Sequence, residues 1–170
     1  MIQLEPFNES DFAQFISWVA DEELLVTIAG SVFSFPLTEQ QLEAYLRDQN
    51  SHAFKIVDIV SHKTIGHAEL CGTGERTYKI DKLLIGDHTN RGKGIGQKVM
   101  DKLLEHAFTK MDAETVELNV FDWNSSAIRC YEKTGFTFNP DKTAMFNIGD
   151  KKWTAINMSI GKKDWVRLLS

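Results

Sequence analysis

One segment of the sequence has residue types and spacing that suit the binding of an anion. Gly92, Gly94 and Gly96 alternate with other residues directly after an apolar run, and a helical pattern begins at once behind them. Glycine lets the backbone approach a ligand closely and adopt positive φ, and the start of a helix offers free N–H groups and the positive end of its dipole. The segment from Arg91 to Gly96 therefore predicts a backbone cradle for a phosphate group.

Two common nucleotide-binding patterns do not fit this segment. A P-loop needs Lys and then Ser or Thr directly after its last glycine, whereas Gly96 is followed by Gln97 and Lys98. A dinucleotide fingerprint that starts at Gly92 would need its third glycine at position 97. The pattern that does fit is Arg-x-x-Gly-x-Gly over residues 91–96.

A second motif lies downstream of the glycines. Residues 124–136 follow the pattern Asn-x-x-Ala-x-x-x-Tyr-Glu-Lys-x-Gly-Phe. Together, the two motifs resemble those of the GCN5-related N-acetyltransferase (GNAT) superfamily, and most closely its branch of ribosomal-protein alanine N-acetyltransferases. The resemblance covers residues 52–138 well and the N-terminal helices more loosely. It implies direct transfer of an acetyl group from acetyl-coenzyme A (acetyl-CoA) to an amine, without a metal.

The resemblance also implies which residues contact the cosubstrate. Six consecutive residues would hold its pyrophosphate: Arg91, Gly92, Lys93, Gly94, Ile95 and Gly96. Three residues of the preceding strand would pair with the pantetheine arm, and one of their amides would polarise the thioester carbonyl: Leu83, Leu84 and Ile85. Three residues of the second motif complete the expected contacts: Asn124, Ala127 and Tyr131.

Two side chains are candidates for proton transfer. Tyr131 matches the family position whose phenol protonates the sulfur of CoA, and a pKa near 10 suits that role. The alternative is that Tyr131 only packs against the sheet. Glu69 is the candidate general base for the incoming ammonium, and its alternative is a cross-strand ion pair with Lys82. Asp81 is a second, weaker carboxylate that faces either the acceptor or solvent.

Other reactive side chains support different chemistry less well. His67 and Cys71 share the face of Glu69, but strand residues at i and i+2 stand about 6.5 to 7 Å apart, too far for a nucleophilic triad. Cys130 lies on a helix that packs against the sheet, so an acyl-cysteine hydrolase is a minor alternative. The histidines show no metal-ligand spacing on one element, and we expect no metal site.

The composition is that of a globular protein. The chain has 170 residues, 42% of them hydrophobic, a formal net charge of -5 and two cysteines. We expect one domain over residues 1–170, and no general binding to nucleic acid or membranes. The N-terminus lacks a signal pattern and no apolar run reaches about 20 residues, which favours a cytoplasmic location. The expected partners are an amine acceptor, either a small molecule or a peptide N-terminus, and, as one option, a second copy in a homodimer.

Periodicity predicts the elements that position these groups. Helices are expected over residues 11–19, 38–50, 96–110 and 125–133. Strands are expected over residues 2–7, 54–60, 64–71, 78–85, 116–120, 136–138 and 153–160. This order, with the family resemblance, predicts an α+β (mixed α/β) fold whose mostly antiparallel sheet is splayed at the cofactor site and carries helices on both faces.

Three local predictions concern caps and the acceptor. Thr38 and Gln41 have capping-box spacing, and Asn124 is expected to cap the helix that ends before Gly135. Residues 21–37 are expected to form an irregular substrate loop. Three aromatic residues and an acidic run lie where the family builds its acceptor wall: Trp18, Phe33, Phe35 and residues 21–23. A cationic amine would be compatible with that wall, and the alternative is that the same residues are core and solvated surface. A non-catalytic acyl-CoA sensor is the main alternative function.

Overall fold

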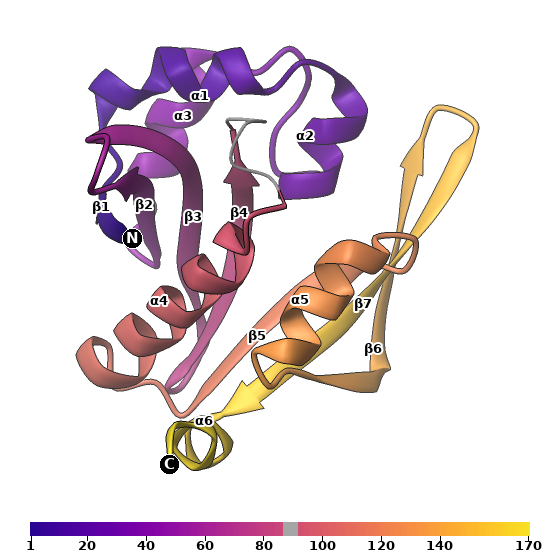
Figure 1. Cartoon of the computed structure of the whole chain (residues 1–170). Helices are drawn as coiled ribbons and strands as arrows, with labels where there is room; N and C mark the ends of the chain where they lie inside the picture. Colours follow the sequence, from indigo (N-terminus) through magenta and orange to yellow (C-terminus); the bar gives the residue numbers. More distant parts are fainter. Residues whose placement is uncertain (87–91) are drawn as a thin grey trace.

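The computed structural model describes residues 1–86 and 92–170 of the chain. Its elements are β1 (Ile2–Pro6), η1 (Glu9–Asp11), α1 (Phe12–Trp18), α2 (Glu22–Ala29), α3 (Glu39–Leu46), β2 (Ser51–Asp58), β3 (Lys63–Gly74), β4 (Thr77–Ile85), α4 (Ile95–Lys110), β5 (Thr115–Phe121), α5 (Ser125–Lys133), β6 (Thr137–Ile148), β7 (Lys151–Gly161) and α6 (Lys162–Leu169). Figure 1 shows how they are arranged.

Seven strands form one sheet in the order β1-β2-β3-β4-β5-β7-β6. Within the described residues, β4 and β5 form the one parallel pair, and every other neighbouring pair is antiparallel. Helices cover the sheet, and two separate apolar clusters form, one containing the buried face of α4 and one containing α1, α2 and α3. The predicted mixed, mostly antiparallel fold with helices on both faces is confirmed.

The sheet opens between β4 and β5. These strands pair through residues 77–80 of β4 and residues 115–118 of β5, and β4 residues beyond Ile80 have no partner on β5 in the part of the chain that the structure describes. Figure 1 shows the two strands diverging from that point. On its other side β4 stays paired with β3 as far as Ile85. The free edge of β4 at residues 83–85 therefore borders the opening.

Helix α4 fixes one wall of this opening. Its predicted apolar face is buried at every position: Val99, Met100, Leu103, Leu104, Ala107 and Phe108. A helix anchored on one whole face has a fixed start, so Gly92 and Gly94 just before it are held at the open end of the sheet. Helix α5 covers the predicted residues and ends before Gly135, whose φ of 102° suits the position after a helix.

Two predicted caps differ in detail from the structure. Thr38 accepts a hydrogen bond from the Gln41 amide, as expected, but the Gln41 side chain bonds to the backbone of Ser34 and Pro36 instead of closing a capping box. Asn124 occupies the N-cap of α5, yet its side chain makes no capping bond among the described residues. Its φ of -86° and ψ of 68° lie outside the extended region typical of side-chain caps, and its side chain remains available at the cleft described below.

Several element predictions were wrong. Residues 22–29 of the expected loop form α2, whose β-branched residues weaken the helical signal. Strand β2 runs from Ser51 to Asp58, whereas residues 54–60 were predicted. Strand β6 has 12 residues where three were expected, because it is an exposed edge strand without apolar alternation. Helix α6 was not predicted. Figure 1 shows β6 and β7 as a long hairpin at the sheet edge.

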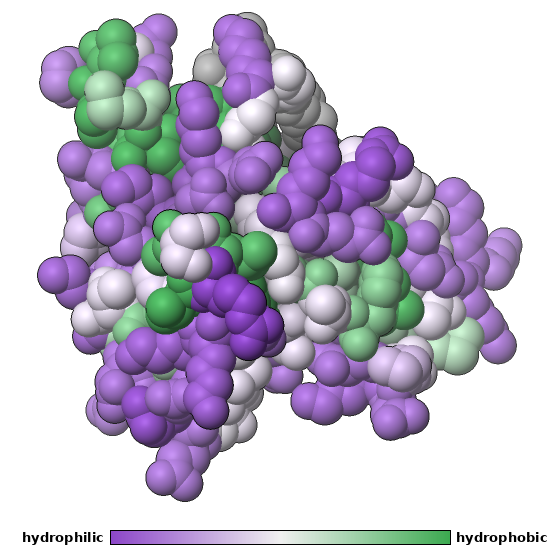
Figure 2. All heavy atoms as spheres, turned by 60° about the horizontal axis from the view of Figure 1, so that its bottom comes forward, coloured by the Kyte–Doolittle hydropathy of each residue, from purple (hydrophilic) through white to green (hydrophobic). Residues whose placement is uncertain are grey.

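Hydrophilic residues cover most of one face of the molecule (Figure 2). Figure 2 shows a face on which polar side chains predominate and hydrophobic ones lie in smaller separate patches. Among residues 1–86 and 92–170, no helix has the length and apolar character needed to cross a membrane.

Candidate active site

A cleft of about 710 Å³ lies at the open end of the sheet, between α2, the end of β4, the start of α4, and α5. Ten of the residues predicted to bind the cofactor line it: Leu83, Leu84, Ile85, Gly92, Gly94, Ile95, Gly96, Asn124, Ala127 and Tyr131. Lys93 is not among the lining residues, and Arg91 lies outside the described residues. Residues far apart in the sequence thus meet at one site, which we call the cleft.

The start of α4 presents backbone donors to the cleft. Gly92 and Gly94 have φ of 78° and 71°, and a Cβ at either position would meet no atom within 4 Å. Gly94 is the N-cap of α4, and within the described chain no side chain bonds to the first turn. Among the described residues, the first bond of the helix joins the Lys98 amide to the Gly94 carbonyl at 3.2 Å, so the three amides between them have no helical partner in residues 1–86 and 92–170. This donor set fits a pyrophosphate group.

Two basic residues at the cleft were not predicted from the sequence. Arg129 and Lys133 lie four residues apart on α5, and both line the cleft. The i, i+4 spacing places them on one face of the helix, which is the signal that could have found them. They add positive charge near the glycine amides in an otherwise acidic chain.

The free edge of β4 supplies a second set of backbone groups. Leu84 and Ile85 pair with His67 and Gly66 of β3, and Leu83, Leu84 and Ile85 line the cleft on the side that β5 leaves open. Unpaired strand edges bind extended, amide-bearing chains. The edge therefore fits the pantetheine arm of CoA, as the glycine amides fit its pyrophosphate.

Tyr131 brings a proton donor to the same cleft. Its ring is partly buried and packs against Phe136 with the centroids 6.1 Å apart. Burial raises the pKa of the Tyr131 phenol above its usual range, and the neighbouring Cys130 adds to the rise. The hydroxyl is therefore protonated at neutral pH and available as a donor, but the raised pKa makes it a weaker acid than a free phenol.

Glu69 is a buried carboxylate that lies outside the cleft. Its Oε1 accepts a bond from Lys82 Nζ at 2.8 Å, its carboxylate also accepts a bond from Ser51, and it is 2% exposed. Burial lowers the pKa of the Lys82 ammonium, but Asp81 and Glu69 together outweigh that effect and raise it. The ion pair with Lys82 is thus present. Glu69 lines a second cavity of about 490 Å³, the Glu69 pocket, with Tyr45, Cys71 and also Asp81 among others. Its role as base stays a prediction.

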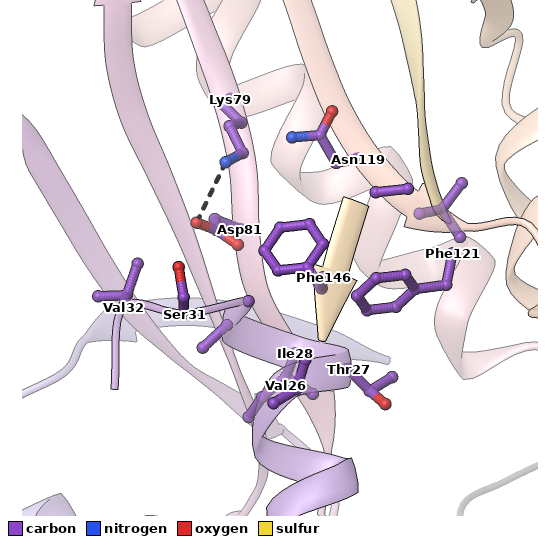
Figure 3. A pocket seen from close by; sticks show the side chains of 14 residues that line it. Val26, Thr27, Ile28, Ser31, Val32, Lys79, Asp81, Asn119, Phe121 and Phe146 are labelled. Atoms are coloured by element: carbon purple, nitrogen blue, oxygen red, sulfur yellow. Dashed lines mark ion pairs between the residues drawn. The ribbon is translucent and has the colours of Figure 1, made fainter. Parts of the chain in front are cut away.

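A smaller cavity of about 220 Å³, the α2 pocket, lies between α2, β4, β5 and the β6–β7 hairpin. Figure 3 shows the ion pair between Lys79 and Asp81, 3.5 Å between Nζ and Oδ2, with the rings of Phe121 and Phe146 close by. Thr27 and Ile28 line both this pocket and the cleft. The α2 pocket therefore adjoins the cleft through a shared wall and contains a carboxylate.

None of the three aromatic residues predicted for the acceptor wall lines the α2 pocket, whereas Phe33 lines the Glu69 pocket. Trp18 lies against Gly86, where a Cβ would come within 2.0 Å of its ring. Phe33 is buried in the core and Phe35 is 44% exposed, and neither lines the α2 pocket. Its rings come from Phe121 and Phe146 instead. The second of these lies on β6, which the sequence did not predict to extend so far.

The remaining candidates do not form a catalytic group. His67 is fully buried, and its Nδ1 lies 2.8 Å from the carbonyl oxygen of Lys82. Cys71 lines the Glu69 pocket, whereas Cys130 lines the cleft. Burial raises the pKa of both thiols, which disfavours a nucleophilic thiolate. Among the residues that the structure describes, no group of three His, Cys, Asp or Glu side chains could hold a metal ion.

Residues 2–137 match the family model described as "Acetyltransferase (GNAT) domain". The spermine/spermidine N(1)-acetyltransferase of Bacillus subtilis (strain 168) is 35% identical over 60 residues, and this match spans 35% of the chain and 39% of that relative's length. The aminoglycoside N(6')-acetyltransferase type 1 of Klebsiella pneumoniae is 26% identical over 150 residues, which cover 78% of this chain and 70% of that one.

Solved structures show the same fold. A spermidine N-acetyltransferase from Vibrio cholerae, solved in complex with CoA and spermine, matches with a TM-score of 0.82 at 18% identity, covering 97% of this chain and 98% of that one. Aminoglycoside acetyltransferase AAC(6')-Ib, solved with coenzyme A and kanamycin, matches with a TM-score of 0.76 at 20% identity over 100% of both chains. None of these named relatives is a ribosomal-protein acetyltransferase, so that finer assignment stays a prediction.

Proposed function

We propose that this chain, which belongs to the acetyltransferase (GNAT) domain family, transfers an acetyl group from acetyl-CoA directly to a primary amine of a small cationic molecule. The observation that carries the proposal is the cleft. It brings together the glycine-flanked amides of α4, the free edge of β4 and the Tyr131 hydroxyl. Acetyl-CoA, when bound, supplies the activated thioester.

The residues of the cleft have separate tasks. The amides of Ile95, Gly96 and Gln97 bind the pyrophosphate, and Arg129 and Lys133 add favourable charge. The free edge at residues 83–85 orients the pantetheine arm, and one of its amides polarises the thioester carbonyl. The Tyr131 hydroxyl donates a proton to the departing sulfur. No covalent enzyme intermediate is needed.

The acceptor amine enters from the α2 pocket in this proposal. That pocket shares Thr27 and Ile28 with the cleft, so an amine in it has a short path to the thioester. Asp81 lines the pocket and offers a carboxylate to an ammonium group, which would replace or share the contact with Lys79 on the same pocket wall. A shallow groove lined by Asp21, Glu23, Trp123 and Trp153 adjoins it at Thr27 and also favours a cation. The names of the relatives, which include spermine and aminoglycoside acetyltransferases, support a small amine.

Asp81 is better placed than Glu69 to receive the acceptor ammonium. The Asp81 side chain is 20% exposed and lines the α2 pocket, while its lysine partners stand 3.4 and 3.5 Å away. Glu69 is enclosed by its own ion pair and does not line either the cleft or the α2 pocket. We assign amine binding to Asp81, which accepts one proton from the ammonium so that the neutral amine can attack the thioester, with Glu69 as the weaker candidate for this base. The amine nitrogen then loses a second proton, which replaces the one that Tyr131 gives to the departing sulfur.

The test is release of free CoA thiol from acetyl-CoA with a panel of amines: spermine, an aminoglycoside, a simple monoamine and a short peptide with a free N-terminus. The proposal predicts amine-dependent release with the cationic small molecules. Release with the peptide alone would indicate that the acceptor is a protein N-terminus and would contradict the small-molecule proposal. Tight binding of CoA without release for any amine would favour the sensor alternative. Amine-independent release with an acylated cysteine, seen by mass spectrometry, would favour a hydrolase.

A further inference from the structure

Lys82 is a buried cation at an unusual point of the backbone. The residue is 4% exposed and has φ of 49°, in the left-handed region that non-glycine residues avoid. This conformation costs roughly 1 to 2 kcal/mol, and such strain persists only where the surroundings enforce it. The contacts around Lys82 must therefore hold this backbone conformation in place, which suggests a functional role for the residue.

The strain belongs to a β-bulge at the mouth of the cleft. Asp81 pairs with Glu69 and Leu84 pairs with His67, so three steps along β4 face two steps along β3. Pairing with β5 ends at Ile80, and the cleft-lining residues of β4 begin at Leu83. The extra residue thus lies between the last paired position and the free edge. Bulges bend a strand and re-aim the residues that follow.

The backbone of the bulge is held by His67. Its Nδ1 lies 2.8 Å from the Lys82 carbonyl oxygen, and since a carbonyl can only accept, the imidazole donates. Burial lowers the pKa of His67 to about 4, so the ring is neutral at pH 7. The rings of Phe7 and Phe15 lie 4.7 and 4.6 Å from it, centroid to centroid. This packing fixes the donor in place.

The side chain of the bulge residue is held by Glu69. Lys82 Nζ lies 2.8 Å from Glu69 Oε1 and 4.9 Å from the centre of the Tyr45 ring. It also lies 3.4 Å from Asp81 Oδ2, and the Lys82 amide donates to Asp81 Oδ1 at 2.9 Å. The position of Lys82 therefore also orients the carboxylate that lines the α2 pocket.

Two residues of β3, at i and i+2, thus hold one residue of β4 through its carbonyl and its ammonium. We propose that His67, Glu69 and Lys82 form a bulge latch that keeps the free edge at residues 83–85 and the Asp81 carboxylate in register with each other. The functional part of this inference rests on the proposed acetyl transfer. In this proposal Glu69 is a positioning residue, because its carboxylate holds Lys82 through the ion pair and does not itself accept a proton from the acceptor amine.

A purely stabilising role does not account for the pair. Taking both charges out of water costs about as much as their attraction returns, and apolar replacements of buried pairs are often neutral or stabilising. A role in positioning the site does account for the pair, because a misplacement of about 1 Å in a reacting site can lower the rate about 100-fold. The latch predicts that the rate, and not the stability, depends on the pair.

The central test compares wild type with Lys82→Met/Glu69→Leu, which removes both charges and leaves neither unpaired. Lys102→Met/Glu105→Leu is the control, because it also removes both charges of an ion pair, 3.3 Å apart, on the exposed face of α4. We expect the double variant to melt within a few degrees of wild type and to bind CoA with a Kd within about threefold. Its kcat should fall about 10- to 100-fold, while the control keeps the wild-type rate.

Hydrogen exchange provides a readout that does not need turnover. Exchange in the peptide that contains residues 83–85 should accelerate in the double variant, whereas exchange in α4 should not change. A folded double variant with wild-type kcat, or with unchanged exchange at residues 83–85, would overturn the latch. If wild type releases no thiol with any amine, the proposed function fails, and hydrogen exchange still decides whether the latch holds the edge.

Glu69→Gln keeps the shape of the side chain and serves if the double variant does not fold. The latch predicts a kcat about 10-fold lower with an unchanged shape of the pH–rate profile. Loss of the acidic limb of the profile would instead identify Glu69 as the general base and overturn the positioning role. A wild-type kcat in this variant would also overturn the positioning role.

Discussion

Substitution of Gly94 by Trp tests the pyrophosphate cradle. Gly94 has φ of 71° at the N-cap of α4, and nothing lies within 4 Å of an added Cβ, which would therefore project into open space at the cleft. An indole group there would cover the amides of Ile95, Gly96 and Gln97. We expect the variant to fold and to lose affinity for CoA.

The expected magnitude follows from the donors that would be covered. A hydrogen bond to a charged group contributes about 1.5 to 3 kcal/mol, and loss of two of these three bonds costs about 3 to 6 kcal/mol. This corresponds to a Kd roughly 100- to 20,000-fold higher. The positive φ adds a separate cost of roughly 1 to 2 kcal/mol to stability for any side chain at this position.

Gly94→Ala is the matched control, because it shares the cost of the positive φ but leaves the cleft open. Calorimetric titration with CoA should give the alanine variant an affinity within about tenfold of wild type, and both variants should melt a few degrees lower. If Gly94→Trp and Gly94→Ala bind CoA equally well, the pyrophosphate does not lie at these amides and the assignment of the cradle fails.

Three further predictions concern Tyr131, the two cysteines and His67. Tyr131→Phe should lower kcat about 100-fold or more with little change in the Kd for CoA, and an unaltered kcat would remove the hydroxyl as the proton donor. CoA should slow alkylation of Cys130, which lines the cleft, and leave Cys71 unaffected, as peptide mass spectrometry would show; equal protection of both would contradict the position of the cleft. Burial lowers the pKa of His67 to about 4, so between pH 6.5 and 4 the imidazole binds a proton in the unfolded chain but not in the folded one. The free energy of unfolding therefore decreases as the pH falls from 6.5 towards 4. Urea unfolding at pH 7 and pH 5 should show a loss of about 2 kcal/mol that is absent in His67→Gln, and the same loss in that variant would exclude His67 as its source.

Local signals predicted the cofactor side of the site well. The glycine spacing, the six apolar positions of α4 and the bounds of α5 depend on short-range pattern, and each of them was visible in the sequence. These elements bring most of the predicted cofactor residues to one cleft. Arg129 and Lys133 were missed although their spacing was available.

Long-range pairing determined what the sequence did not show. The position of Glu69 depends on a one-residue bulge opposite it, and no local pattern announces the left-handed φ of Lys82. The acceptor side depends on α2 and on the tip of the β6–β7 hairpin. Their sequences are weak in helical propensity and apolar alternation, so the rings of the α2 pocket could not be assigned in advance.

The central claim is that the acetyl group passes from acetyl-CoA to the acceptor amine. Acetyl-CoA labelled in the acetyl group, incubated with enzyme and the best amine of the panel, gives the most direct measurement. We predict one labelled acetyl group on the amine for each CoA thiol released, with none on Cys71 or Cys130. Label recovered as free acetate or on either cysteine, with none on the amine, would contradict direct transfer.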